Sequence, residues 1–287
     1  MSSATAQLDT AFAEQDKVNG YFESAASYWR DIYFDTRLQP TIYRDRQNIA
    51  FRWIRKLHMP LSSRILEIGC GAGFLSVALA RKGFYIDAMD STPTMVELAR
   101  SHAVRSRVAR RINICEGDVH ALSMPSNQYD IVIALGVIPW LHSEQRAIEE
   151  MKRILKPGGY LLITADNEIR LNRVLDPRSS PLLKPVRQTA KYIVQMFACS
   201  SGVSTQFEPK RHYPSEIDRM IEKAGLSKVR SAAIGFGPFT FFGKPVLSDH
   251  AGVWLHRRLQ RLSLHGVAGI RSLGSHYLVL ARKPAQR

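Results

Sequence analysis

The stretch that decides the fold reads ILEIGCGAG and runs from Ile65 to Gly73. A short apolar segment leads directly into Gly69, Gly71 and Gly73, and a helical pattern begins immediately after them. Glycines at a strand-to-helix turn permit a tight turn and let a ligand approach the backbone closely. The dipole at the N-terminus of the following helix would point at that ligand. We therefore expect a ligand to bind at the first turn of an α/β domain.

Outward from this turn, apolar strands and helices alternate along the chain. The segment YDIVIAL at 129–135 is continuously apolar, as expected when both faces of a sheet are covered. We expect strands at 64–68, 84–89, 112–115, 129–135, 160–165, 228–234 and 276–281, and helices at 74–82, 93–102, 143–155 and 215–224. This order predicts a doubly wound, Rossmann-like α/β fold with a seven-stranded, mostly parallel sheet and right-handed crossovers.

The segments around this core predict the domain organisation. Residues 1–58 are expected to form a helical N-terminal extension or lid, with a polar, loosely ordered start and a helix break near Pro40. Residues 59–287 are expected to form the ligand-binding domain. Insertions at 168–212 and 236–274 interrupt this domain and are expected to cap the substrate.

Composition narrows the classes of partner and compartment. Lys and Arg number 40 against 25 Asp and Glu, so the formal net charge is +15 and the surface attracts polyanions. The basic residues are spread along the chain rather than gathered in a stripe with aromatics, so no specific nucleic-acid partner is expected. Three scattered cysteines, Cys70, Cys115 and Cys199, show no zinc spacing and fit a reducing compartment. With no signal-peptide pattern and no membrane-spanning apolar run, we expect a cytoplasmic protein without a metal centre.

Two acidic residues near the glycine turn indicate which class of ligand it binds. An NAD-binding fingerprint would carry its third small residue one position later, where this chain has Phe74, and the Lys of a P-loop is absent. Glu67, just before the turn, would repel a pyrophosphate but suits the cationic amino group of an amino-acid-like ligand. Asp90, about twenty residues further on at the end of the second strand, can accept hydrogen bonds from both ribose hydroxyls. Together the two acids fit an adenosine that carries a cationic amino-acid arm.

These residues resemble the first motif of class I S-adenosylmethionine-dependent methyltransferases of the small-molecule type. Four further blocks follow in the family's order: Asp90-Ser91, Glu116-Gly117-Asp118-Val119, Tyr129–Leu135 and Leu155–Tyr160. The resemblance covers residues 60–166 and, more loosely, 213–235. It implies S-adenosylmethionine as the cofactor. The cofactor-binding residues that it implies are Glu67, Gly69, Cys70, Gly71, Gly73, Asp90, Ser91, Asp118, Val119 and Leu135.

The resemblance also assigns roles. Asp90 would bind the ribose, Asp118 the adenine amino group, and the strand that ends at Leu135 would reach the methionine arm. Tyr21 or Phe22 is expected either to fold over the cofactor as a lid or to pack on the sheet.

Methyl transfer from a sulfonium requires a nucleophile held in line with the methyl group and, for a hydroxyl or amine, a base. No residue identifies itself as that base. His142, His212 and Tyr213 are candidates, although a surface or packing role is the ordinary alternative for each. The catalytic residues are therefore left unassigned.

Aromatic residues gather in the N-terminal segment and in GFGPFTFFG at 235–243, which favours a small organic, lipophilic acceptor and O-methylation over N- or C-methylation. Two other functions stay open. A nucleic-acid methyltransferase would explain the charge, but the polar, proline-containing tetrad of that class is missing from Leu135–Trp140. A non-catalytic nucleotide-binding protein on the same fold is the second alternative, since a fold does not prove activity.

The insertions mix basic with apolar residues and are expected to carry substrate choice. One hypothesis is peripheral contact with an anionic membrane that holds a lipophilic substrate. The alternative is a cap that packs its apolar face over the active site. The residues concerned in the first insertion are Arg170, Arg173, Arg178, Leu182, Lys184, Val186, Arg187, Lys191, Tyr192, Ile193, Met196, Phe197, Lys210 and Arg211, and VWLHRRLQRLSL at 253–264 repeats the pattern.

Overall fold

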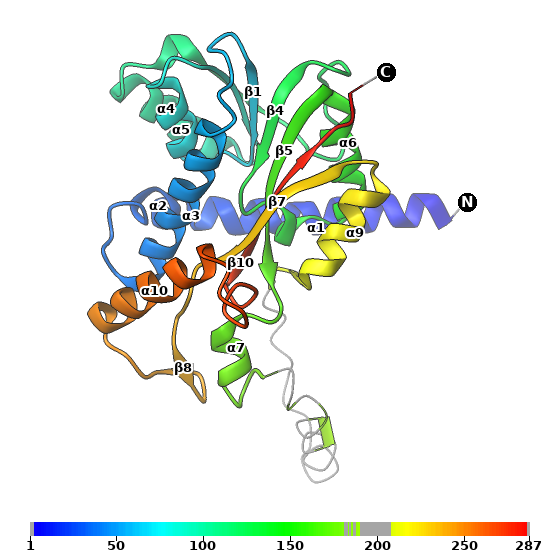
Figure 1. The fold of residues 1–287 in the computed structure, drawn as a ribbon. Coiled ribbons are helices and arrows are strands. Elements are labelled where there is room, and N and C mark those ends of the chain that lie inside the picture. The colour runs from blue at the N-terminus through cyan, green and yellow to red at the C-terminus, as the bar shows by residue number, and fades with distance from the viewer. Residues whose placement is uncertain (1–2, 181–182, 184, 186–187, 190–207, 286–287) are drawn as a thin grey trace.

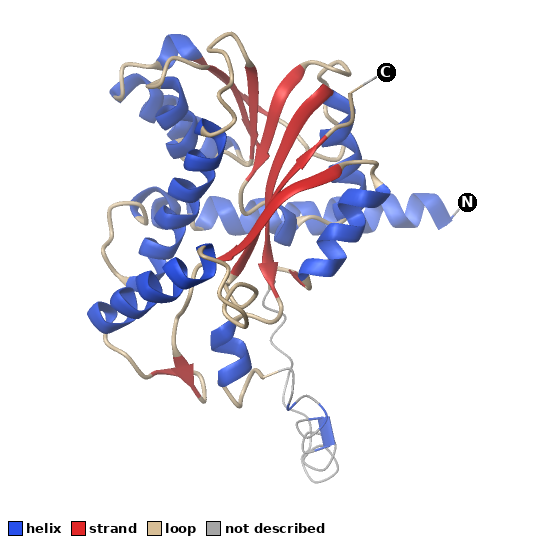
Figure 2. Ribbon diagram, viewed as in Figure 1, coloured by secondary structure: helices blue, strands red, loops and turns tan. Residues whose placement is uncertain are grey.

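The structure, a computed structural model, describes residues 3–180, 183, 185, 188–189 and 208–285. A twisted central sheet lies between two layers of helices (Figure 1; Figure 2). Its strands are β1 (Arg64–Ile68), β2 (Tyr85–Asp90), β3 (Ile112–Glu116), β4 (Tyr129–Ala134), β5 (Leu155–Asn167), β6 (Arg211–His212), β7 (Ser227–Ile234) and β10 (His276–Arg282). The main helices are α1 (Ser3–Ser24), α2 (Ala26–Asp31), α3 (Leu38–Arg55), α4 (Phe74–Ala80), α5 (Pro93–Arg105), α6 (Glu144–Ile154), α7 (Leu171–Leu175), α9 (Pro214–Lys223) and α10 (Asp249–Leu264).

The strand order places a ligand crevice in the middle of the sheet. Seven strands follow the path β3-β2-β1-β4-β5-β10-β7, and the short β6 pairs with the end of β5. Every pair on this path is parallel except those of β10, which runs antiparallel to β5 and to β7. The predicted seven-stranded, mostly parallel sheet is therefore confirmed. The chain winds outward from β1 to β3 and then returns to the other side of β1, and such folds bind ligands at this reversal of strand order.

Both faces of the sheet are buried, which explains the continuously apolar strands. In β4, Ile131 and Ile133 belong to the core cluster beneath α3, α4 and α5, whereas Val132 belongs to the cluster beneath α6 and α9. All three side chains are fully buried. Burial of such a side chain stabilises the fold by about 1.5–3 kcal/mol. The carboxyl ends of the strands are thus held in place by two cores.

The N-terminal region differs from the sequence prediction in two ways. A continuous helix, α1, occupies Ser3–Ser24, where the composition predicts a loosely ordered start. It is held by tertiary contacts that composition does not reveal, because Val18 is buried and Asn19 accepts a hydrogen bond from the Ser91 hydroxyl at 2.9 Å.

The predicted helix break near Pro40 is present but lies a few residues earlier, at residues 32–37 between α2 and α3. Helix α3 begins at Leu38, so Pro40 lies in its first turn, where a backbone N–H has no partner within the helix to lose.

Strand β5 is longer than predicted, since it begins at Leu155 rather than at residue 160. Its register against β4 jumps from the Tyr129–Leu155 pair to the Ile131–Tyr160 pair, so the Gly158-Gly159 turn forms an irregularity inside the strand. A Cβ on Gly159 would lie 2.9 Å from the Lys156 carbonyl oxygen, so this glycine is required by the backbone itself.

The two insertions are partly described. In 236–274, the hairpin of β8 (Thr240–Phe241) and β9 (Lys244–Pro245) precedes α10. Helix α10 is anchored by the buried His256, whose Nδ1 accepts the Phe236 N–H at 3.0 Å and whose Nε2 lies 3.0 Å from Asp45 of α3. In 168–212, the residues singled out above that lie outside the described residues are Leu182, Lys184, Val186, Arg187, Lys191, Tyr192, Ile193, Met196 and Phe197, together with Cys199.

In the part of the chain that the structure describes, no helix is long and apolar enough to cross a membrane.

Candidate active site

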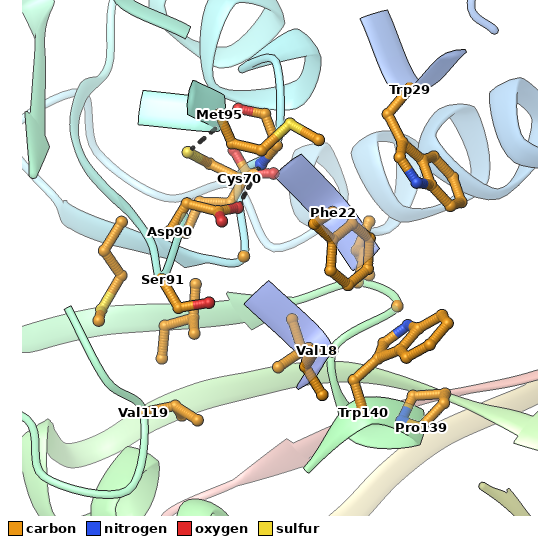
Figure 3. A pocket seen from close by; sticks show the side chains of 18 of the residues that line it. Val18, Phe22, Trp29, Cys70, Asp90, Ser91, Met95, Val119, Pro139 and Trp140 are labelled. Atoms are coloured by element: carbon orange, nitrogen blue, oxygen red, sulfur yellow. Dashed lines mark hydrogen bonds between the residues drawn. The ribbon is translucent and has the colours of Figure 1, made fainter. Parts of the chain in front are cut away.

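A cavity of about 320 Å³ lies at the carboxyl ends of β1, β2, β4 and β5 (Figure 3). Nine of the ten predicted cofactor-binding residues line it, and Gly73 is the exception because it lies one position beyond the lining part of the turn. Segments that the motifs do not include supply the opposite walls, among them α1, α3 and the first residue of β10. Sequence analysis therefore located one side of the cavity.

The glycine turn is shaped by positive φ angles at Gly69, Gly71 and Gly73, a backbone region that L side chains rarely adopt. A Cβ on Gly69 would lie 2.4 Å from the Val137 side chain, so the protein itself excludes a larger residue there. A Cβ on Gly71 would meet no protein atom within 4 Å, and the residue lines the cavity. Gly71 is therefore the position where the backbone is open to a ligand.

Asp90 ends β2 and holds the glycine turn in place. Its Oδ2 accepts the Gly71 N–H at 2.9 Å and its Oδ1 accepts the Thr92 N–H at 3.1 Å. Burial raises the pKa of this carboxyl above its ordinary value, while the backbone hydrogen bonds act in the opposite direction. Each oxygen retains a second lone pair, so the carboxylate can still accept hydrogen bonds from a ligand.

Glu67 lies beneath the turn and is 4% exposed. Its carboxylate accepts a hydrogen bond from the Ser76 hydroxyl on α4. Burial raises the pKa of Glu67 to about 7, and the nearby Asp90 adds to the rise. A cation in the cavity would favour the ionised form of this buried acid.

The adenine-side residues predicted from the motif lie on the loop after β3. The Asp118 Oδ1 lies 2.8 Å from the His120 Nδ1, and this hydrogen bond lowers the pKa of Asp118. The His120 ring stacks on His142 with 3.6 Å between ring centroids. Val119 is buried against the cavity. The histidine pair thus orients Asp118, a contribution that sequence spacing does not reveal.

An aromatic wall closes the cavity opposite the glycine turn. Phe22 of α1 lies edge-on to Trp140, with ring centroids 5.0 Å apart, and also contacts Trp29 (Figure 3). Tyr21 stacks on the same Trp140 ring at 5.2 Å. Tyr21 and Phe22, predicted as either lid or packing residues, therefore line the cavity and pack on Trp140, a residue of the loop after β4.

A polar corner of the cavity was not predicted from the sequence. Arg46 of α3 is 7% exposed, lies over the Tyr43 ring, and has no carboxylate within 4.0 Å among the described residues. Its Nε lacks a hydrogen-bond partner there. Asp166, at the end of β5, and His276, at the start of β10, complete the corner. In the sequence Arg46 is one of 40 basic residues, and only its burial distinguishes it.

The candidate bases from the sequence do not line the cavity. His142 stacks on His120, the Nε2 of His212 lies 3.4 Å from Glu144, and Tyr213 is 42% exposed at the start of α9. The aromatic segment 235–243 does not line it either, because Phe236 and Phe239 pack in a separate cluster with α3. The aromatic residues of the cavity come from the N-terminal segment and the loop after β4.

Cys70 lines the turn, and burial raises the pKa of its thiol well above the ordinary value, so it is a protonated packing residue. Among the described residues, no cluster of three His, Cys, Asp or Glu side chains could hold a metal ion.

Comparison with known proteins agrees with this geometry. Residues 66–163, which run from β1 into β5, match the family model described as a methyltransferase domain. The protein is an S-adenosylmethionine-dependent methyltransferase. Its cofactor is therefore S-adenosylmethionine, as the motifs predict.

The methyltransferase is similar to two curated ubiquinone biosynthesis O-methyltransferases. It is 26% identical to that of Aeromonas salmonicida over 220 residues, which cover 76% of this chain and 84% of the relative. It is 25% identical to that of Coxiella burnetii over 190 residues, which cover 66% and 74%.

Among solved structures, the fold is similar to magnesium protoporphyrin IX methyltransferase from Synechocystis PCC 6803 with bound SAH. The TM-score is 0.62 and the identity 16%, over 94% of this chain and 99% of the other. A methyltransferase from Thermotoga maritima gives a TM-score of 0.54 at 18% identity, over 91% and 98%. At these identities the likeness concerns the fold alone.

Proposed function

We propose that this methyltransferase transfers a methyl group to a hydroxyl of a small, lipophilic aromatic acceptor. The observation that carries the proposal is that one cavity joins the glycine turn to an aromatic wall made by Phe22, Trp29 and Trp140. Such a wall suits a planar apolar ring. The curated relatives named above are O-methyltransferases of ubiquinone biosynthesis, which supports oxygen as the target atom.

The residues around the turn fit S-adenosylmethionine. Asp90 would bind the ribose hydroxyls, Asp118 the adenine amino group, and the open face of Gly71 would receive the ligand against the backbone. The buried Arg46, which lacks a carboxylate partner among the described residues, would bind the carboxylate of the amino-acid arm. Glu67 would compensate the positive charge of the ammonium group on the same amino-acid arm. Bound there, the cofactor supplies a methyl group activated by a positively charged sulfur.

With the cofactor in this position, the other residues that line the cavity also have proposed roles. Leu135 and the residues after it would border the methionine arm, and Ser91, Cys70 and Val119 would line the nucleoside. Phe22 and Trp140 would hold the acceptor ring and exclude water, so the reaction would depend on positioning the hydroxyl in line with the methyl carbon.

Calorimetric titration with S-adenosylmethionine and with its demethylated product tests the cofactor site. We expect Asp90→Ala to weaken binding by about a hundredfold or more, because two charged hydrogen bonds of about 1.5–3 kcal/mol each are lost. Asp31→Ala is the matched control, since Asp31 is exposed on α2 and pairs with its neighbour Arg30.

Incubation with S-adenosylmethionine and catechol, followed by mass spectrometry, tests the acceptor class. We expect a singly O-methylated product. Well-folded protein that binds neither form of the cofactor would contradict the cofactor site, and binding without transfer to catechol would contradict the aromatic-hydroxyl acceptor.

We also infer peripheral contact with an anionic membrane. Phe241 and Phe242 at the tip of the β8–β9 hairpin and Trp254 on α10 are 53%, 58% and 63% exposed. The hairpin and α10 lie on the same side of the molecule (Figure 1). Arg258 lies over the Trp254 ring, 5.8 Å from its centroid, and Arg257 and Arg261 of α10 add further positive charge, a combination typical of interfacial binding.

A further inference from the structure

Among the described residues, four carboxylates line the cavity, and three of them already accept hydrogen bonds from the protein. Glu67 accepts a hydrogen bond from a serine hydroxyl, Asp90 from two backbone N–H groups and Asp118 from a histidine ring. The fourth, Asp166, accepts no side-chain hydrogen bond from any residue that the structure describes. The Nε2 of the His276 ring lies 3.8 Å from its Oδ1, which exceeds hydrogen-bond distance. Asp166 is therefore the carboxylate that is free to receive a proton from a ligand.

Asp166 also lies beside the loop where methyl transfer is proposed. The Gly136 N–H, just after β4, donates to the Thr164 Oγ1 of β5 at 2.7 Å. Side chains two residues apart on a strand share a face, so Asp166 follows Thr164 on the same face at the end of β5. Asp166 lines the same cavity as Leu135 and Gly136, the segment that would border the methionine arm. This step rests on the proposed function.

The surroundings of Asp166 are positively charged. The charged or titratable groups that face it are Tyr43 and Arg46 of α3, Arg170 just before α7, Arg211 and His212 of β6, and His276 of β10. Burial outweighs these cations and raises the pKa of Asp166 above the ordinary value of an aspartate. A carboxylate with a raised pKa is a stronger base.

We propose that Asp166 is the general base that removes the proton of the acceptor hydroxyl during methyl transfer. The O–H bond breaks and its proton moves to a carboxylate oxygen of Asp166. A lone pair of the acceptor oxygen forms the bond to the methyl carbon, while the carbon–sulfur bond breaks and its electron pair stays on sulfur as a neutral thioether. Asp166 then releases the proton to solvent and returns to its ionised form.

His276 is the alternative base in the same corner, and its geometry disfavours that role. Its Nδ1 lies 3.1 Å from the position that a Cβ on Gly235 would take, so this nitrogen faces the backbone at the end of β7. Its Nε2 faces Asp166. Burial and the neighbouring arginines lower the pKa of His276 well below its ordinary value, so the ring is neutral and leaves the charge of Asp166 in place.

The kinetic test compares Asp166→Asn with wild type on two acceptors, catechol and nitrocatechol. The nitro group makes the phenolic hydroxyl far more acidic, so nitrocatechol depends less on a base. We expect Asp166→Asn to bind the demethylated cofactor as wild type does and to lose about a hundredfold or more in kcat/KM with catechol, the range typical of a lost general base. The loss should shrink at least tenfold with nitrocatechol. Asp31→Asn is the matched surface control.

A second test measures the proton uptake that accompanies acceptor binding, without catalytic turnover. Nitrocatechol is titrated calorimetrically into protein loaded with the demethylated cofactor, at a pH where the free ligand is anionic, in buffers of different ionisation heat. Two anionic oxygens in contact share one proton, so wild type should take up about one proton on binding and Asp166→Asn none.

The outcomes separate the two proposals. Equal losses with both acceptors, or no proton uptake by wild type that binds nitrocatechol, would overturn the role of Asp166 and leave the O-methyltransferase proposal standing. Wild type that neither binds nor methylates either acceptor would contradict the acceptor class itself, and the base role would fall with it.

Discussion

Glu67 and the glycines after it show how single residues serve both the fold and the site. The acid is nearly fully buried beneath the turn, bonded to Ser76, and its pKa is raised from 4.5 to about 7. Below about pH 4.5 it is neutral in both the folded and unfolded states. Between about pH 4.5 and 7 the unfolded state loses the proton while the folded state keeps it. This acid therefore makes the free energy of unfolding fall as pH rises through that window.

Glutamine does not titrate, so we expect the stability of Glu67→Gln relative to wild type to increase as the pH rises from about 5 to about 8. The comparison is made without cofactor. The gain should be on the order of 3 kcal/mol, the free energy that corresponds to the pKa shift. Denaturant unfolding at the two pH values measures it. An unchanged stability difference between the variants would show that Glu67 titrates normally.

The glycines offer a second test at the same scale. Gly69 and Gly71 both have positive φ, but only at Gly69 would a Cβ collide with the protein, at 2.4 Å from Val137. Gly71→Ala should cost about 1–2 kcal/mol of stability from backbone strain alone and should strongly weaken cofactor binding. Gly69→Ala should be more destabilising, because a clash adds to the strain. Thermal unfolding and cofactor titration of both variants check this order, and equal stability losses would contradict it.

At the scale of elements, α1 completes a cavity that the Rossmann-like core leaves open. Its contacts with the core are the burial of Val18, the Asn19–Ser91 hydrogen bond and the aromatic contacts of Tyr21 and Phe22 with Trp140. The residues of α1 that make these contacts lie outside the methyltransferase motifs. Cavity closure is thus a property of the N-terminal extension, and it can be altered without touching the cofactor motifs.

We expect the double variant Tyr21→Ala, Phe22→Ala to weaken binding of the demethylated cofactor on the order of tenfold. The contacts of both rings with Trp140, of about 0.5–1.5 kcal/mol each, are lost, while the sheet keeps its core. The control is Tyr85→Ala, whose ring is 61% exposed at the start of β2. Equal affinity for the double variant and wild type would show that α1 does not cover the cofactor.

At the scale of the whole molecule, the net charge of +15 and the exposed rings of the hairpin and α10 predict salt-dependent binding to anionic vesicles. Sedimentation with vesicles that contain phosphatidylglycerol should show binding at low salt, which falls at high salt. Phe242→Ser with Trp254→Ser should weaken it, and neutral vesicles serve as the control. No sedimentation with anionic vesicles at either salt would dismiss the membrane contact.

The sequence by itself determined the central architecture and half of the site. Hydrophobic periodicity is local, so it revealed the strands and helices of the core. The spacing of the glycines, Glu67 and Asp90 indicated the ligand site, and the resemblance to the methyltransferase motifs added Asp118. The position of the helix break near Pro40 was less precise, because a proline can either begin a helix or interrupt one.

Only the tertiary structure decided which side chains form the opposite wall. Arg46, Asp166 and His276 come from three elements distant in sequence, and nothing in their neighbourhoods marks them out. Their chemistry arises from burial: Arg46 lacks a carboxylate partner among the described residues, and burial raises the pKa of Asp166. Burial and pairing are properties of packed segments rather than of adjacent residues, so they appear only when the chain has folded.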